Sequence, residues 1–392
     1  MKIIIIASGF TGATLPLANS LVRKGCEVVF YNFRQWDVTF IESIDLDIPK
    51  RIPTGSPELL SKSNRLYTYL DKTVDFYFLP FWKRRGKLEK LFIGKIFSWL
   101  NTKLYINYAK AIFDEKADYI NVIVYSYHDV ILARAIWEAG IPMCITYHEV
   151  LQGLVGEEKL KPTVAETIKY GTPIIVHSHN TAKKLINVSC DPSIEKRIHI
   201  INFGAFESYL SYGKGNTPNE LPKRYLLYIG HVHPYKGLKY LYEAVEIIDN
   251  RLDDVKIIVA GDGFDPIIKK MKTNPRFMVF NHFIANAELV GFIRHCQAIV
   301  CPYIAASQSG LVQTAMVWGK PVIATRVGAF TEVIRDGENG LLCQPSNSKS
   351  LADAIERFLN IKCSFHVSCV PDNLNWDVIA DKYIKLFSSI RS

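Results

Sequence analysis

The sequence lacks the cysteine patterns that hold small secreted domains and zinc-binding domains together. Its 392 residues include eight cysteines, but they form no Cys-x-x-Cys pair and have no regular spacing. This scatter argues against a disulfide framework or a structural zinc site, and it fits a reducing cytosol. No stretch approaches the roughly 18 to 20 uninterrupted apolar residues needed to span a bilayer, so we expect any membrane contact to be peripheral.

Length and composition are those of a two-domain globular protein. A chain of 392 residues exceeds what one hydrophobic core usually supports, and a hydrophobic share of 48% is enough for two cores. Short apolar runs rich in β-branched residues alternate with segments of helical spacing, beginning with KIIIIAS, GFTGATLPLANSLVRKG and CEVVFYNF. This alternation predicts an α/β fold with mostly parallel, doubly wound sheets. It stops at residues 208–222, which collect Gly, Pro, Asn and Ser, and then restarts.

The formal net charge of +9 is partly concentrated in one segment. Residues 83–95 contain six Lys or Arg against one Glu, between two aromatic-rich stretches. A helix over 87–104 would be amphipathic, with two interpretations: packing on its own domain, or attachment of residues 81–104 to an anionic membrane surface. We do not expect nucleic acid as a partner, because the aromatic side chains gather on the apolar side instead of alternating with basic residues on an open face.

The turns that follow strands are the candidate binding sites, because ligands of open α/β sheets bind outside the carboxyl ends of the strands. YIGHVHPYKG places His231, Lys236 and Gly237 between a strand and a helix, where the lysine would reach an anion and the glycine would let the backbone approach it. In CPYIAASQSGLVQTAM a strand ends near Tyr303 and a helix begins close to residues 308–310. The free amides of such a helix start favour phosphate binding.

Four stretches of the second half, taken together and in order, resemble the retaining GT-B glycosyltransferases of family 4, the glycosyl transferases group 1 set. They are YIGHVHPYKGLKYLYEAV, IIVAGDGFDP, AELVGFIRHCQAIVCPY and GKPVIATRVGAFTEVIRDGENGLL. The resemblance implies the GT-B fold, with two Rossmann-like domains facing an interdomain cleft. The expected divisions are an acceptor domain (1–205), a linker (206–222), a nucleotide-sugar donor domain (223–370) and a helix returning to the first domain (371–392).

The function implied by this resemblance is that of a hexosyltransferase. Such an enzyme moves a sugar from a nucleotide-diphosphate donor to a glycan or lipid-linked acceptor, with retention at the anomeric carbon. It needs no metal and no cofactor, since the nucleotide sugar is a substrate, and the protein itself must then supply positive potential for the leaving diphosphate. We expect a cytoplasmic enzyme, peripheral on the inner face of the plasma membrane, that serves surface polysaccharide or glycoconjugate synthesis.

The resemblance also implies the site residues. His148, directly after a predicted strand, and Lys236 are the candidate catalytic residues, and His148 would hydrogen-bond the donor sugar or orient the attacking hydroxyl. His177 and His179 alternate at a strand end, so at least one of them is expected to be structural. The candidate donor-binding residues are Gly12, His231, Gly237, Gln308, Ser309, Gly310, Gln313 and Thr314.

Two departures from the family pattern bear on activity. Ala306 and Thr314 stand where the family has two glutamates, and neither can act as a carboxylate, although nearby hydroxyl and amide side chains still bind hydroxyls. His231 stands where the family usually has arginine, which exchanges a permanent charge for an imidazole that is partly protonated near neutrality. Whether the missing glutamates abolish activity is left open by the sequence.

Three other functions share features with this sequence. The sequence argues against a nicotinamide-dependent enzyme, because Leu15 occupies the third glycine position of the dinucleotide motif and residues 32–34 offer no acidic side chain for a ribose. A non-hydrolysing nucleotide-sugar epimerase of the same fold would also use the donor block. A non-catalytic nucleotide-sugar binding partner of another transferase would explain the missing glutamates.

Overall fold

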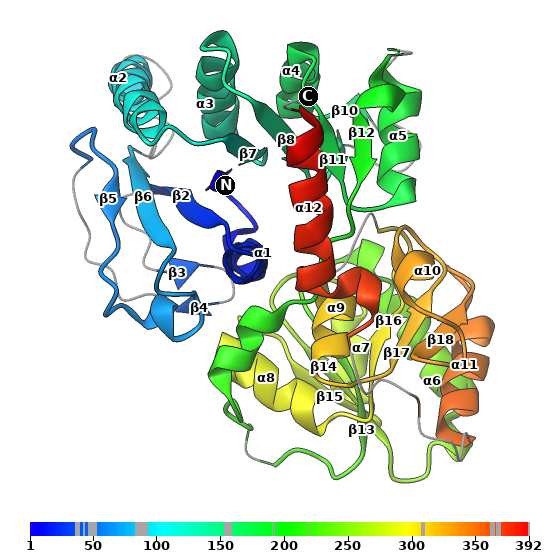
Figure 1. Ribbon diagram of the computed structural model, residues 1–392. Coiled ribbons are helices and arrows are strands. Elements are labelled where there is room, and N and C mark those ends of the chain that lie inside the picture. Colours follow the sequence, from blue (N-terminus) through cyan, green and yellow to red (C-terminus); the bar gives the residue numbers. More distant parts are fainter. Residues whose placement is uncertain are drawn as a thin grey trace. The chain divides into compact units, whose positions relative to one another are not determined.

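The computed structural model describes residues 1–35, 40–41, 44–45, 53–82, 93–152, 159–189, 191, 193–218, 220–306, 310–360, 365 and 370–390. The chain divides into two compact units (Figure 1). Unit 1 comprises Met1–Gly204 and Trp376–Ser392, and unit 2 comprises Ala205–Asn375. Residues 206–222, predicted as a linker, lie within unit 2, where Glu207–Tyr212 forms a 3₁₀ helix.

Unit 1 is built on an eight-stranded sheet of order β12-β11-β8-β7-β1-β2-β6-β5, parallel except at the β5 edge. Its strands are β1 (Lys2–Ala7), β2 (Glu27–Gln35), β5 (Glu58–Leu59), β6 (Asp75–Phe81), β7 (Tyr119–Ile123), β8 (Met143–Tyr147), β11 (Ile174–Val176) and β12 (Ile198–Ile200). The four isoleucines of β1, residues 3–6, are completely buried. This burial explains the unbroken apolar run, since helices cover both faces of a parallel sheet.

The helices of unit 1 follow its strands, and four short strands complete its elements. The helices are α1 (Thr11–Arg23), α2 (Ile93–Asp114), α3 (Tyr127–Glu138), α4 (Pro162–Thr167), α5 (His179–Ser189) and α12 (Trp376–Ile390). The short strands are β3 (Phe40–Ile41), β4 (Ile44–Asp45), β9 (Leu151–Gln152) and β10 (Lys159–Leu160).

The last helix, α12, packs against the first, α1, although the whole of unit 2 separates them in the sequence. The Arg23 guanidinium contacts the Asp377 carboxylate at 2.7 Å, and Lys24 Nζ contacts Asp381 at the same distance. Tyr383 of α12 is buried against the sheet. The buried face of α12 outweighs the two exposed ion pairs, because surface pairs contribute at most about 1 kcal/mol each.

Unit 2 is a six-stranded, fully parallel sheet of order β15-β14-β13-β16-β17-β18. Its strands are β13 (Tyr225–Ile229), β14 (Lys256–Ala260), β15 (Phe277–Phe280), β16 (Ala298–Cys301), β17 (Val322–Thr325) and β18 (Gly340–Cys343). Its helices are α6 (Leu238–Ile247), α7 (Ile268–Thr273), α8 (Asn286–His295), α9 (Gly310–Val317), α10 (Phe330–Val333) and α11 (Ser348–Asn360). The prediction of two α/β units with parallel sheets is therefore confirmed.

The basic segment 81–104 is only partly described. Residues 83–92 lie outside the described residues, and α2 begins at Ile93. The attachment of this segment to a membrane surface therefore stays a prediction. Among the helices that the structure describes, none is long and apolar enough to cross a membrane.

Candidate functional site

The loops that follow three neighbouring strands of unit 2 interlock at one edge of the sheet. After β13, Val232 N donates to the Asp262 carbonyl in the loop after β14 at 2.7 Å. On the other side, Ile304 N, in the loop after β16, donates to the Tyr235 carbonyl at 2.9 Å. The loop that carries His231, Lys236 and Gly237 is thus held from both sides at the carboxyl edge, where ligands of such sheets bind.

Gly237 joins the 3₁₀ helix Pro234–Lys236 to α6 and adopts a left-handed conformation, with φ of 74°. A Cβ at this position would lie 1.9 Å from the Pro302 carbonyl oxygen. No side chain fits at that distance. The glycine is therefore required by the packing of two loops as well as by the turn.

Lys236 is half-buried, and its ammonium lies over an aromatic ring. Nζ is 3.8 Å from the centre of the Tyr303 ring and 5.0 Å from that of Tyr235. Contacts of this kind contribute roughly 0.5 to 2 kcal/mol and fix the position of the charge. The predicted positive charge is therefore held in place at the carboxyl edge of unit 2.

His231 is exposed in the same loop, and its carbonyl accepts a hydrogen bond from the Tyr228 hydroxyl at 2.7 Å. His233 was missed by the sequence reasoning, although it alternates with His231 in HVH. Its ring lies 6.2 Å from that of His231, and its Nδ1 accepts from Tyr235 N at 3.4 Å. This second imidazole helps to begin the 3₁₀ helix that presents Lys236.

The remaining donor-site candidates of unit 2 lie at the start of α9. Gln308 and Ser309 lie outside the described residues, and Gly310 is the first residue of the helix. Thr314 Oγ1 donates to the Gly310 carbonyl at 2.7 Å, and the residue is 3% exposed. Its hydroxyl proton is therefore used inside the helix. Gln313 is also buried, so contacts of these two side chains with a donor stay predictions.

In unit 1, an aromatic or imidazole ring follows each of five neighbouring strands at the carboxyl edge of the sheet. This ring row consists of Phe203 (after β12), His177 (after β11), His148 (after β8), Tyr125 (after β7) and Phe10 (after β1). The His148 ring stacks on Phe10 at 4.1 Å and lies 4.5 Å from His177 and 4.7 Å from Phe203. The candidate Gly12 is buried in the first turn of α1, directly after Phe10 and Thr11.

Both histidines of the ring row are buried and uncharged. Burial holds the pKa of His148 well below its ordinary value, and the neighbouring His177 and Lys161 act in the same direction. Burial also lowers the pKa of His177 to about 4. His177 Nδ1 donates to the Ile201 carbonyl at 2.8 Å, so that its Nε2 carries no proton in the neutral ring. The Nε2 atoms of both rings are buried and have no hydrogen-bond partner among the described residues.

We expect stability to fall in mild acid because of His177. Its pKa in the folded state lies below the value of about 6.5 in the unfolded chain, so the unfolded chain binds the additional proton first and stability is lost as the pH falls below 6.5. The loss from this ring is about 1 kcal/mol per pH unit near pH 5.5. Urea titrations of the wild type and His177→Asn at pH 6 and pH 5 measure it, since only the wild type loses this contribution.

Asp129 contributes a pH dependence of stability of the opposite sign. This contribution is the same in the wild type and in His177→Asn. Burial raises the pKa of this carboxyl to about 6, so its own contribution to stability decreases as the pH rises toward 6. It therefore cancels in the comparison of the two proteins. Equal losses of stability in wild type and His177→Asn would contradict the prediction.

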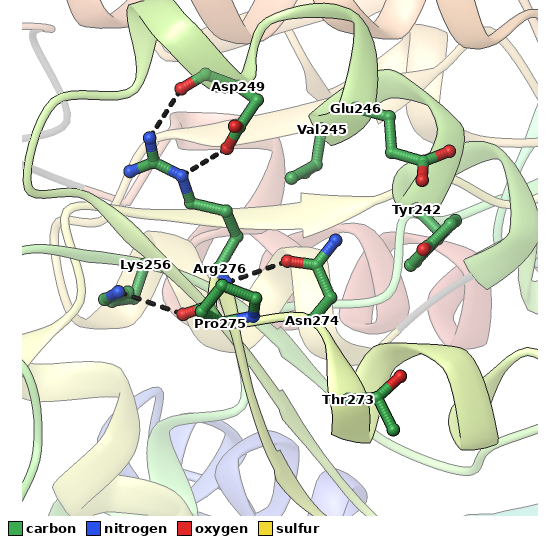
Figure 2. A pocket seen from close by; sticks show the side chains of 9 residues that line it. All are labelled: Tyr242, Val245, Glu246, Asp249, Lys256, Thr273, Asn274, Pro275 and Arg276. Carbon is green, nitrogen blue, oxygen red and sulfur yellow. Dashed lines mark hydrogen bonds and ion pairs between the residues drawn. The ribbon is translucent and has the colours of Figure 1, made fainter.

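A pocket of about 740 Å³ lies elsewhere in unit 2 (Figure 2). Its lining includes Lys256, at the beginning of β14, and Arg276, directly before β15, which places it at the amino edge of the sheet. Both cations are already bound: Lys256 donates to the Pro275 carbonyl and Arg276 to Asp249, as Figure 2 shows. The pocket is therefore at the edge opposite to the loop of Lys236 and offers no unoccupied cation to a phosphate.

Comparison with known proteins shows which family the second part of the chain resembles. Residues 223–360 match the family model described as glycosyl transferases group 1. An uncharacterized glycosyltransferase of Methanocaldococcus jannaschii is 31% identical over 186 residues, which are 45% of this chain and 48% of that protein. A phosphatidyl-myo-inositol mannosyltransferase of Mycobacterium leprae is 25% identical over 173 residues, 42% of this chain and 46% of the relative. The chain thus spans about half the length of the curated relatives it matches.

Solved structures show the same fold over the whole chain. The catalytic domain of starch synthase IV from Arabidopsis thaliana, bound to ADP and acarbose, has a TM-score of 0.65 at 13% identity and covers 99% of both chains. The UDP-GlcNAc 2-epimerase of Methanocaldococcus jannaschii has a TM-score of 0.60 at 15% identity, covering 99% of this chain and 100% of that one. Because the fold is common to a synthase and an epimerase, it does not separate these activities. Residues 223–360 therefore resemble the glycosyl transferases group 1 family, and the chain has the GT-B fold.

Proposed function

We propose that this protein is a retaining hexosyltransferase that moves a sugar from a nucleotide-diphosphate donor to a glycan or lipid-linked acceptor, without a metal or cofactor. The observation that carries the proposal is the fixed ammonium of Lys236 beside Gly237, within the segment that matches the family. A diphosphate gains negative charge as the glycosidic bond breaks. A charge already positioned at the leaving group stabilises that transition state without reorganisation.

The loop of Lys236 supplies more than one group for a diphosphate. The exposed imidazole of His231 lies in the same loop and is a second group for a diphosphate. Gly237 serves the packing of the loop, since it is buried and its amide donates to the Pro234 carbonyl at 3.0 Å. Since His231 replaces the usual arginine, diphosphate binding depends more strongly on Lys236.

In unit 1, His148 is proposed to hydrogen-bond the donor sugar or to orient the attacking hydroxyl. Its buried ring is uncharged at neutral pH, so it acts as a hydrogen-bonding group and not as a cation. We further propose a cytoplasmic location, with residues 81–104 on the inner face of the plasma membrane and a role in surface polysaccharide or glycoconjugate synthesis. The relative that acts on phosphatidyl-myo-inositol, by its name, supports a lipid-linked acceptor.

A thermal-shift series tests the donor assignment. A nucleotide diphosphate present at a hundred times its Kd adds about 2.7 kcal/mol of stability to the protein that binds it. We expect UDP or GDP to raise the melting temperature well above the effect of inorganic phosphate at equal concentration, because the nucleoside adds contacts. Equal shifts from phosphate and from every nucleotide would contradict the assignment.

Product analysis separates transfer from the two alternatives. Purified protein is incubated with nucleotide sugars and candidate acceptors, and the products are resolved. A linked sugar shows a transferase, an isomerised donor shows an epimerase, and saturable binding without turnover shows a binding partner. The missing glutamates at Ala306 and Thr314 make the third outcome the main competitor of the proposal.

A further inference from the structure

The ring of Phe10 occupies an unusual position at the start of α1. Phe10 has φ of 56°, in the left-handed region where a bulky side chain is uncommon. Its ring stacks on His148 with 4.1 Å between the centres and an angle of 23° between the planes. The Tyr125 ring also contacts Phe10. It is perpendicular to the Phe10 ring, with 5.5 Å between the ring centres. The left-handed backbone at Phe10 is unfavourable for a phenylalanine, and its effect is to place the ring against the candidate catalytic residue His148.

The turn that holds Phe10 is fixed by neighbours from β7 and α3. A Cβ at Gly9 would lie 2.6 Å from the Tyr125 ring, so these two loops are in direct contact. Ser8 Oγ donates to the Asp129 carboxylate, which also accepts from Ser126 N at 2.8 Å and Tyr125 N at 3.0 Å. The carboxylate therefore ties the turn after β1 to the turn after β7, and it fixes the backbone on which Phe10 lies.

His177 fixes the other side of His148. Its Nδ1 proton is donated to the Ile201 carbonyl, which leaves Nε2 unprotonated. This nitrogen and His148 Nε2 are both buried without a partner among the described residues. The two rings lie 4.5 Å apart, centre to centre, and buried polar atoms without a protein partner point to a hydrogen-bonding group supplied by a ligand.

We propose that Phe10 and His177 are positioning residues for His148, which hold its imidazole in one orientation so that Nε2 meets a hydroxyl of the bound sugar. The inference rests on the proposed function for the identity of the ligand as a sugar. Phe10 restricts the movement of the His148 ring by stacking on it. His177 is a neutral neighbour, so it places no positive charge beside the His148 ring. Neither residue needs to touch the reacting atoms.

The charges around His148 are compatible with a neutral ring. Lys161 acts on it from the boundary of β10 and α4, and its ammonium is paired with the Glu149 carboxylate at 2.7 Å. His177 faces it from the end of β11 and is itself uncharged. Burial, His177 and Lys161 all lower the pKa of His148, so each of them disfavours the imidazolium.

The test uses the full chain labelled with ¹³C- and ¹⁵N-histidine and no ligand. Phe10→Gly removes the ring while suiting the left-handed backbone, so we expect it to fold. His177→Asn keeps a donor in the place of Nδ1 and lacks Nε2. The signals of His148 are assigned from the spectrum of His148→Gln. The conservative variant Phe10→Tyr retains a flat ring, and Phe264→Ala, which removes an exposed ring of unit 2, is the control.

In Phe10→Gly and His177→Asn we expect the pKa of His148 to rise by about one pH unit or more, as water reaches the ring and a neighbouring group is lost. Phe10→Tyr and Phe264→Ala should leave it at the wild-type value. An unchanged titration and tautomer of His148 in both positioning variants would overturn the proposal. So would an equal change in Phe264→Ala.

Activity then separates this inference from the proposed function. With donor and acceptor, Phe10→Gly should lower kcat about tenfold while the KM for the donor changes less than twofold, and Phe10→Tyr should restore kcat. If the NMR changes occur in a protein that transfers no sugar, the positioning of His148 stands and the proposed function fails. If sugar is transferred and the His148 signals do not respond to either variant, the function stands and the inference fails.

Discussion

Gly237→Ala is expected to abolish nucleotide binding and to lower the free energy of unfolding of unit 2 by at least about 3 kcal/mol. The left-handed backbone alone costs an alanine about 1 to 2 kcal/mol. The larger part comes from the Pro302 carbonyl, 1.9 Å from the added Cβ, because a backbone group of a neighbouring loop cannot rotate away. The loop after β13 must therefore separate from the loop after β16. Lys236, adjacent in the chain, then loses its place over Tyr303.

Gly337→Ala is the matched control in the same unit. Its φ of 85° is close to the 74° of Gly237, but a Cβ there would meet only the end of the Arg357 side chain, at 3.4 Å. We expect this variant to lose about 1 to 2 kcal/mol and to bind nucleotide normally. Urea unfolding measures both losses, and titration with UDP or GDP measures binding. Equal losses in the two variants would show that the close approach to Pro302 contributes nothing.

The features that the sequence allowed us to predict are those set by local pattern. The isoleucine run of β1 and the period of the helices decide the elements, and a parallel sheet then places every following turn at one edge. His148 was predicted directly after a strand, and it does follow β8. Thr314 is different, because its spacing of four from Gly310 puts its hydroxyl proton on a helix carbonyl, which motif comparison ignores.

The ring row was not predictable from the sequence, because its members come from five strands and its geometry depends on their order. The sequence does not indicate the left-handed backbone of Phe10, since a positive φ is expected of glycine or asparagine and not of phenylalanine. The contact of Trp376 with Phe203 joins residues separated by the whole of unit 2. Local periodicity carries no information about such contacts, which arise from the topology of the complete sheet.

Lys236→Met is expected to lower kcat by about 10² to 10³-fold, if the ammonium stabilises the leaving diphosphate. Methionine retains an apolar stem that packs on Tyr303, so the loop keeps its structure while the charge is removed. The charge on the diphosphate increases as the bond to the sugar breaks, so the lysine interacts more strongly with the transition state than with the bound donor. We therefore expect the loss in kcat with a much smaller change in the Kd for the donor.

Lys239→Met separates this specific effect from a general loss of positive charge. Lys239 lies three residues further along, on α6, with a side chain 67% exposed and 3.8 Å from Glu243. Its replacement changes the net charge by the same amount, so any long-range electrostatic attraction of the donor is reduced equally in the two variants. Steady-state kinetics and donor titrations compare them at two salt concentrations. A loss of kcat in Lys239→Met as large as that in Lys236→Met would mean that overall charge, and not the ammonium held over Tyr303, assists the departure of the diphosphate.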